Sequence, residues 1–284
     1  MTALFFTART PAHPPLSPPQ VRMLPLILPL FWWRGALWRA ALAHPAWTGS
    51  WVFVGTAAAA VTAPVVAYFL RRDWARSGRG KVFPRTHPPR GEIARLLALE
   101  AACIAGANLA GWRWAAPRLP PLPLPPAPPS ASALAAEMAA CLLAGDALLW
   151  LYHYGVHRVR CLRRTVHATH HSYKHPYVLG GIYTHPVENM IAAALQLVWP
   201  ALVPTHPYSW WCAFLVWTVV QLEEHSGYDV WWSGAYWLPG GIGARIHSVH
   251  HIDGTKNYGF VFTLWDRLAG TYASPETALP RHCA

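Results

Sequence analysis

Charged residues are scarce in this sequence, and acidic residues are scarcer still. Only 12% of the 284 residues are charged, and no acidic residue precedes Asp73. Apolar residues make up 54% of the chain, which includes seventeen tryptophans, and the mean hydropathy is +0.19. This composition argues against an ordinary soluble domain and predicts an all-α integral membrane protein.

Paired cysteines and the usual signatures of hydrolases are also absent. The five cysteines include no C-x2-C pair, which argues against a disulfide framework and a thiolate metal site and indicates a reducing, cytosol-facing location for the polar parts. The sequence contains neither H-E-x2-H nor Gly-x-Ser-x-Gly. The net charge of +11 comes from basic residues in short loops beside apolar segments, so we expect lipid headgroups rather than nucleic acid as their partner.

The order of apolar, basic and proline-rich stretches predicts five regions. These are a disordered tail (1–20), a membrane anchor region (21–116), a Pro-rich linker (117–132), a histidine-rich domain (133–273) and a short tail (274–284). We expect about four to five transmembrane helices, at 51–70, 93–112, 134–152, 187–204 and 210–222. The positive-inside rule then places the basic loop 71–95, the region 153–186 and everything after Glu223 on one cytosolic face. The fold expected is a helical membrane bundle with a cytosol-facing cap of histidine clusters.

Histidines are concentrated in one part of the chain. Twelve of the sixteen lie between His153 and His251, in the patterns H-x3-H at 153–157 and H-x2-H-H at 167–171 and 247–251. Residues three and four apart share one face of a helix, so each cluster can direct its imidazoles at one point. Repeated clusters of this kind indicate metal ligands rather than a cationic surface helix.

Two single histidines lie at the ends of apolar segments: His185 precedes the segment 187–204, and His225 follows the segment 210–222. Both are on the predicted cytosolic face with the clusters, and we include both as ligands. His175 and His206 are given a structural role instead. Ten imidazoles exceed the four ligands of a tetrahedral zinc ion, so two metal ions are expected. The predicted ligands are His153, His157, His167, His170, His171, His185, His225, His247, His250 and His251.

Asp146 is an acidic residue inside an apolar segment. It shares a helix face with Trp150, His153 and His157, at intervals of four, three and four. We predict that its carboxylate accepts a proton from a ligand imidazole and so orients the ring. The alternative is a buried acid that hydrogen-bonds the backbone of a neighbouring helix.

Ligand type alone leaves zinc, copper, iron and nickel open, because imidazole suits all four. A two-metal site facing lipid favours redox iron, which could attack an unactivated C–H bond with oxygen, whereas zinc would offer hydrolysis, whose usual signatures are missing. A rival of a different class is a membrane zinc-binding protein without redox activity.

The segment from Asp146 to Tyr272 resembles the fatty acid hydroxylase and sterol desaturase superfamily of membrane histidine-box enzymes. The resemblance is carried by Asp146 with YHYGVHR, by VHATHH, and by IHSVHHIDGTKNYGFVFTLWDRLAGTY. THPVEN and EEHSGYD look most like the sterol methyl oxidases and cholesterol hydroxylases. Two positions depart from the pattern, since Arg158 and Ile246 stand where many sterol-acting relatives have further histidines.

The resemblance implies a non-haem di-iron oxidoreductase that uses O2 to hydroxylate or desaturate a lipid, with no catalytic group beyond the metal ligands. The substrate that it implies first is a sterol. A fatty acyl or sphingolipid substrate is the alternative. The implied location is the endoplasmic reticulum membrane, with a plastid membrane as the alternative. Electrons would come from NAD(P)H through cytochrome b5 or a reductase, and we expect this donor to be a separate protein.

Overall fold

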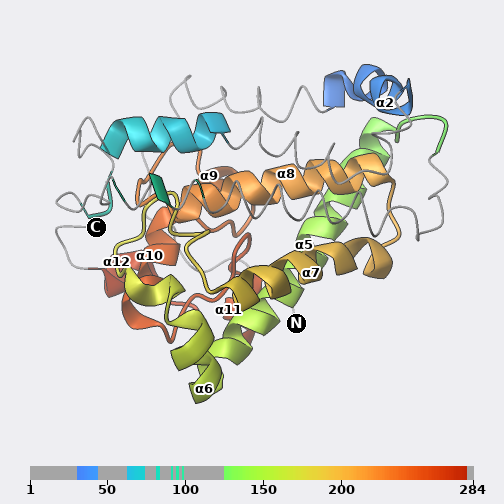
Figure 1. Cartoon of the computed structure of the whole chain (residues 1–284). Coiled ribbons are helices and arrows are strands. Elements are labelled where there is room, and N and C mark those ends of the chain that lie inside the picture. Colours follow the sequence, from blue (N-terminus) through green and yellow to red (C-terminus); the bar gives the residue numbers. More distant parts are fainter. Residues whose placement is uncertain are drawn as a thin grey trace.

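The computed structural model of the chain describes residues 31–43, 63–73, 81–83, 91, 94–95, 98 and 125–279. Within these ranges the secondary structure is helical, with two isolated bridges and no strand (Figure 1). The all-α prediction is therefore confirmed for this part of the chain. The predicted tail 1–20, the predicted span 93–112 apart from three positions, most of the span 51–70 and the first half of the linker 117–132 lie outside the described residues.

Three long helices form the body of the structure: α5 (Ala131–Arg158), α7 (Pro186–Leu202) and α8 (Pro207–Glu224). The α5 helix starts where the Ser130 side chain accepts a hydrogen bond from the Ala133 N–H at 3.1 Å, a normal N-cap. The α8 helix starts with Pro207, which suits the first helical position. Both α7 and α8 pack against α5 (Figure 1). The three helices contain most of the predicted spans 134–152, 187–204 and 210–222.

One helix of the described residues, α5, is long and apolar enough to cross a membrane. Its 28 residues correspond to roughly 42 Å at the usual helical rise. The number of transmembrane helices and the cytosolic orientation of the cap stay predictions.

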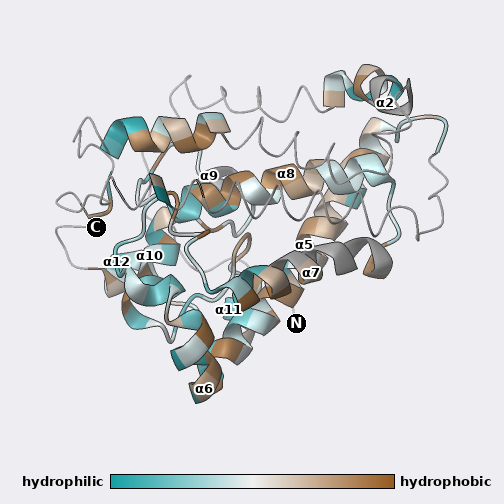
Figure 2. Ribbon diagram, in the orientation of Figure 1, coloured by the Kyte–Doolittle hydropathy of each residue, from teal (hydrophilic) through white to brown (hydrophobic). Residues whose placement is uncertain are grey.

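The largest apolar core lies between α5 and α8. Leu134, Cys141 and Leu149 of α5 pack in it with Cys212 and Val216 of α8. The α2 helix (Arg34–Ala43) adds Trp38, whose indole N–H donates to the Pro125 carbonyl at 2.9 Å. The long helices are thus fixed to each other by apolar burial, and brown residues run along them in Figure 2.

Short elements cover one end of the long helices, where Figure 2 is more hydrophilic. One of them, α10 (Ala244–Asp253), packs against α8. It is capped by Gly254, whose φ of 67° is in the left-handed region that glycine adopts readily. The short elements are α6 (Arg160–Leu162), a π-helical turn η4 (Arg163–His167), a 3₁₀ turn η5 (His170–Ser172), α9 (Gly234–Trp237), α10 (Ala244–Asp253), α11 (Leu264–Ala269) and α12 (Pro275–Ala278).

Asp146 and Asp266 fix the loop 258–262 by accepting five consecutive backbone N–H groups. Asp146 accepts from Phe260 and Val261 through one carboxylate oxygen, at 3.0 and 2.8 Å, and from residue 262 through the other, at 3.0 Å. Asp266 accepts from the N–H groups of residues 258 and 259, at 2.9 and 2.8 Å. Both aspartates are almost completely buried, so these bonds compensate for the loss of hydration.

The predicted partner of Asp146 therefore needs correction. Both of its oxygens are used by the backbone of the loop, not by a ligand imidazole. The alternative interpretation, a buried acid bonded to backbone, is the correct one, although the backbone belongs to a loop and not to a helix. The backbone N–H groups of this loop have no acceptor within the loop itself, so they require the carboxylate. The imidazole N–H of a ligand can instead donate to a backbone carbonyl.

A buried polar cluster joins the segments 63–73 and 81–83 to the loop that follows α8. The Asp73 carboxylate lies 2.6 Å from the Lys81 ammonium and accepts a hydrogen bond from the Tyr228 hydroxyl at 2.8 Å. The Tyr228 ring is fully buried and stacks on Phe69 at a centroid distance of 5.8 Å. Tyr228 lies three residues after His225, so this cluster fixes the chain close to a predicted ligand.

We predict that Asp73→Asn lowers the free energy of unfolding by about 3–5 kcal/mol, because it leaves the Lys81 charge buried without a counter-charge. The double variant Asp73→Asn/Lys81→Met should lose less than the sum of the two single variants. Denaturation of the protein in detergent micelles would measure both, with the more exposed Asp229→Asn as the control. Additive losses would show that the two side chains are not coupled.

Candidate metal centre

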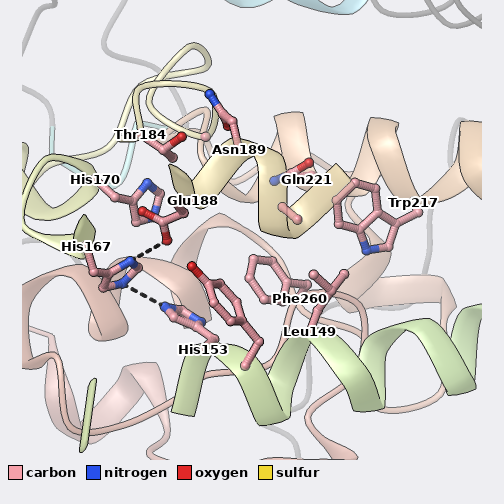
Figure 3. Close-up of a pocket in the computed structure, with 13 residues that line it drawn as sticks. Leu149, His153, His167, His170, Thr184, Glu188, Asn189, Trp217, Gln221 and Phe260 are labelled. Carbon is pink, nitrogen blue, oxygen red and sulfur yellow. Dashed lines mark hydrogen bonds and ion pairs between the residues drawn. The ribbon is translucent and has the colours of Figure 1, made fainter. Parts of the chain in front are cut away.

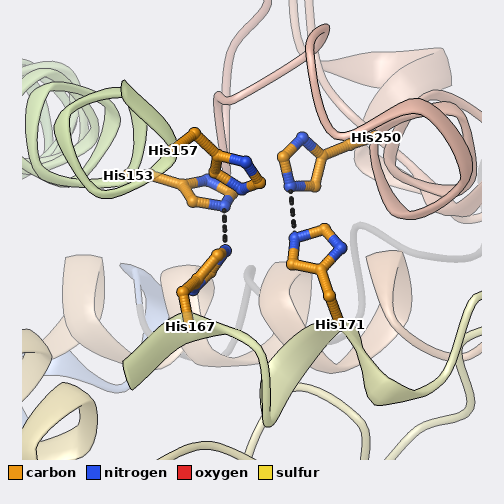
Figure 4. A group of neighbouring side chains, drawn as sticks. All are labelled: His153, His157, His167, His171 and His250. Carbon is orange, nitrogen blue, oxygen red and sulfur yellow. Dashed lines mark hydrogen bonds between the residues drawn. The ribbon is translucent and has the colours of Figure 1, made fainter. Parts of the chain in front are cut away.

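Five histidines form the first cluster, the five-histidine centre. They come from α5, η4, η5 and α10, so four elements that are distant in sequence meet at this point (Figure 4). One potential ligand atom from each lies within 4.8 Å of all the others. The members are His153, His157, His167, His171 and His250.

Four histidines form the second cluster, the four-histidine centre, with the same 4.8 Å limit between their potential ligand atoms. Its members are His170, His225, His247 and His251, and all four are buried. Each adjacent pair, 170–171 and 250–251, is divided between the two centres. Helical geometry permits this division, because neighbouring side chains point about 100° apart on an α-helix and about 120° apart on a 3₁₀ turn.

Distances between Nε2 atoms match the spacing of ligands on a common metal. In the five-histidine centre, Nε2 of His153 lies 3.1 Å from that of His167, and Nε2 of His250 lies 3.0 Å from that of His171. In the four-histidine centre the corresponding distances are 2.9, 3.0 and 3.4 Å. Two nitrogens bound at about 2.1 Å to one ion lie about 3.0–3.4 Å apart in octahedral or tetrahedral geometry. Each centre therefore fits one ion.

The opposite ring nitrogens of several ligands bond to backbone carbonyls. His153 Nδ1 donates to the Tyr258 carbonyl at 2.9 Å, and His250 Nδ1 donates to the Lys256 carbonyl at 2.8 Å. His225 Nδ1 donates likewise to the carbonyl of residue 221 at 2.9 Å. A proton on Nδ1 leaves the Nε2 lone pair free for a metal, so these bonds set both the tautomer and the ring orientation.

Two buried glutamates also face the outer nitrogens, and the sequence interpretation missed both. Glu188 accepts from His167 Nδ1 at 2.5 Å in the five-histidine centre. Glu224 lies in the four-histidine centre, with its oxygens 3.5 Å from His225 Nδ1 and 3.8 Å from His247 Nδ1. Each centre thus has a carboxylate that can balance the charge of a cation. The available signal was their position, since Glu188 stands in THPVEN and Glu224 directly precedes His225.

His185 lies in neither centre. Its Nδ1 accepts a hydrogen bond from the Val187 N–H at 3.3 Å at the start of α7, so the side chain caps this helix. We therefore leave His185 out of the ligand set that we propose. The two histidines excluded from the sequence also lie outside both centres: His206 caps α8, and the His175 ring packs on Phe83.

Burial keeps these imidazoles uncharged at neutral pH. Loss of hydration, together with neighbouring histidines, lowers the pKa of His171 to about 3. The same causes hold the pKa values of His247, His250 and His251 well below the ordinary range. Neutral imidazole is the form that binds a metal, so these nitrogens can act as donors at physiological pH.

A cavity of about 50 Å³ adjoins both centres (Figure 3). Its wall includes His153 and His167 of the five-histidine centre and His170 of the four-histidine centre. The opposite side is apolar, with Leu149, Trp217 and Phe260. One water needs roughly 10–15 Å³ by this kind of measure, so the cavity holds more than a single water. Its other lining residues are Tyr152, Gly181, Thr184, Glu188, Asn189, Ala192 and Gln221.

The described centres and their supporting aspartates all lie within a segment that matches a known family. Residues 138–271 match the fatty acid hydroxylase family. This segment is similar to fatty acid hydroxylase domains and is called the hydroxylase domain below. The match confirms the resemblance stated from the sequence for residues 146–272, and the hydroxylase domain contains every predicted metal ligand.

Individual relatives of the hydroxylase domain carry names of sterol-modifying enzymes. The chain is 29% identical over 218 residues to cholesterol 25-hydroxylase-like protein 1, member 2 of Danio rerio, covering 75% of this chain and 78% of the relative. It is 35% identical to cholesterol 25-hydroxylase-like protein 2 of Danio rerio (61% of each chain) and 30% identical to methylsterol monooxygenase 1 of Danio rerio (49% of this chain, 47% of the relative). The match thus spans less than two thirds of the last two relatives. No solved structure matches the chain.

We predict that His251→Ala and His171→Ala each remove about one metal ion per chain, from the four- and the five-histidine centre respectively, because each deletes a ligand of a single centre. His185→Ala should retain both ions and is the matched control. Elemental analysis of iron-loaded protein would count them. Normal metal content in both ligand variants, or a loss in the control, would contradict the assignment.

We also predict that acid destabilises the metal-free protein. Histidines in the unfolded chain have a pKa of about 6.5 and take up protons below that pH. The same histidines in the folded centres have lower pKa values and stay neutral, so acid favours the unfolded chain. The stability from each such histidine is complete above about pH 6.5 and falls by about 2 kcal/mol at about pH 5. Denaturation midpoints at about pH 7 and pH 5 would measure this. Equal midpoints would show that the imidazoles can be protonated without unfolding.

Proposed function

We propose that the chain is a membrane-bound, non-haem di-iron oxidoreductase that uses O2 to hydroxylate or desaturate a lipid. The observation that carries this proposal is the convergence of nine histidines, most of them buried, into two adjacent centres beside a cavity with an apolar side. Neutral imidazole donors suit iron, and the apolar side suits a hydrocarbon. The match of residues 138–271 to the fatty acid hydroxylase family supports lipid oxidation over zinc storage.

The net hydroxylation inserts one oxygen atom into a C–H bond and releases the other as water, with two electrons and two protons supplied by a reductant. Iron bound at the two centres would supply the reduction of O2. The protein's own part is to hold the substrate. Leu149, Trp217 and Phe260 contact the hydrocarbon, while His153 and His170 place both centres at the cavity wall. Burial of the cavity between α5, α7 and α8 keeps bulk water away from the reacting carbon.

We propose a sterol as the substrate, because relatives named cholesterol 25-hydroxylase-like protein and methylsterol monooxygenase align with the domain. A rigid ring system also loses little conformational entropy on binding, whereas an acyl chain must be ordered bond by bond. We further propose that the protein resides in the endoplasmic reticulum membrane and receives electrons from NAD(P)H through a separate cytochrome b5 or reductase. These features follow from the family resemblance.

The test is turnover by purified protein loaded with ferrous iron and supplied with a reducing system, O2 and a mixture of sterols. We expect an oxidised sterol, detected by mass spectrometry with label from ¹⁸O2 if the product is an alcohol. Protein loaded with zinc is the control and should give no product.

Turnover of a fatty acyl lipid or ceramide alone would retain the oxidoreductase and reject the sterol. Absence of oxidation with every lipid, together with tight zinc binding, would favour the zinc-binding protein.

A further inference from the structure

Three side-chain oxygen atoms of residues that line the cavity are buried and have no hydrogen-bond partner: the Tyr152 hydroxyl, the Thr184 hydroxyl and Oε2 of Glu188. Figure 3 shows Thr184 and Glu188 on the same side of the cavity as His167 and His170, opposite Trp217 and Leu149. A buried polar atom without a partner costs about 1–3 kcal/mol. Such atoms around one cavity indicate that a polar ligand group satisfies them.

Glu188 determines what kind of group this is. The residue is only 6% exposed, and its first oxygen, Oε1, accepts the Nδ1–H of His167 at 2.5 Å. This bond fixes the direction of the carboxylate and leaves Oε2 as an acceptor at the cavity wall. A cation bound at His167 and its neighbouring imidazoles would favour the ionised form of Glu188. In that form Oε2 can only accept a hydrogen bond, so the matching ligand atom is a donor.

Tyr152 and Thr184 supply the complementary half. Each hydroxyl can donate a hydrogen bond, so the oxygen of a ligand can accept from them while its own proton goes to Glu188. An alcohol fulfils both requirements. A ketone or an ether has no proton for Glu188, and a hydrocarbon satisfies none of the three atoms.

We infer that the cavity is a subsite for a lipid alcohol, whose hydroxyl lies among Tyr152, Thr184 and Glu188 and whose oxidised carbon lies within a few bonds of that hydroxyl. The inference rests on the proposed function. Because His153 and His167 line the same wall, the hydroxyl and the reacting carbon are close to each other. Substrates oxidised at the far end of a hydrocarbon tail do not fit this placement.

The test measures binding first, without turnover. Purified metal-loaded protein is kept free of O2 and titrated with two sets of probes: cholesterol, its methyl ether and 5-cholestene, and octadecanol, its methyl ether and octadecane. We expect the alcohol of at least one set to bind at least about tenfold more tightly than its ether and its hydrocarbon. Tyr152→Phe and Thr184→Val should reduce this preference. Tyr154→Phe, on the same helix but stacked on Trp150 and outside the cavity lining, should retain it.

Equal binding of alcohol, ether and hydrocarbon, no binding of any probe, or an unchanged preference in both variants would overturn the inference. The product is then located after O2 and a reductant are added. New oxygen or a new double bond within about three bonds of the hydroxyl supports the subsite, since reacting atoms must approach to about 3–3.5 Å. Oxidation at a remote carbon overturns the subsite and leaves the proposed oxidoreductase intact. An alcohol preference without any oxidised lipid retains the subsite for binding and rejects the oxidoreductase.

Discussion

The acceptance of five consecutive backbone N–H groups by Asp146 and Asp266 is the interaction on which the metal centres depend. It fixes the loop 258–262 against α5. The carbonyl of Tyr258 then orients His153, and the carbonyl of Lys256, two residues earlier, orients His250. One buried carboxylate on α5 thus contributes to the positions of ligands on both α5 and α10. Charged acceptors in a dry interior give strong, directional hydrogen bonds, which suits a site that must keep its geometry.

A second constraint is the packing of nine neutral imidazoles, most of them buried, at short distances from one another. Apolar packing of α5 against α8 creates the dry interior, and helical spacing brings the rings together in it. Loss of hydration, together with repulsion between neighbouring imidazoles when they are protonated, lowers the pKa values of His171 and His251. A bound cation would replace this repulsion by coordination, with Glu188 and Glu224 as nearby counter-charges. Metal binding and folding are therefore expected to be coupled.

The sequence predicted the histidine patterns, the helical class and the family, because each depends on local spacing or on a long, ordered match. It could not divide the ligands between two centres, since the separation of His170 from His171 depends on where α8 and α10 lie. The partner of Asp146 was missed because loop 258–262 is more than a hundred residues away. His185 was included from its predicted membrane face alone, which does not fix the direction of a ring. Glu188 and Glu224 gave no periodic pattern, so their roles appear only in three dimensions.

Mössbauer spectroscopy of protein loaded with ⁵⁷Fe tests the central claim most directly, because it reports the number and the environment of iron sites without requiring a substrate. Five histidines at one centre and four at the other predict two non-equivalent, nitrogen-rich, high-spin ferrous sites in equal amounts. A single type of iron site with one ion per chain, or iron that is washed out as easily as from a surface histidine cluster, would contradict the two-centre account.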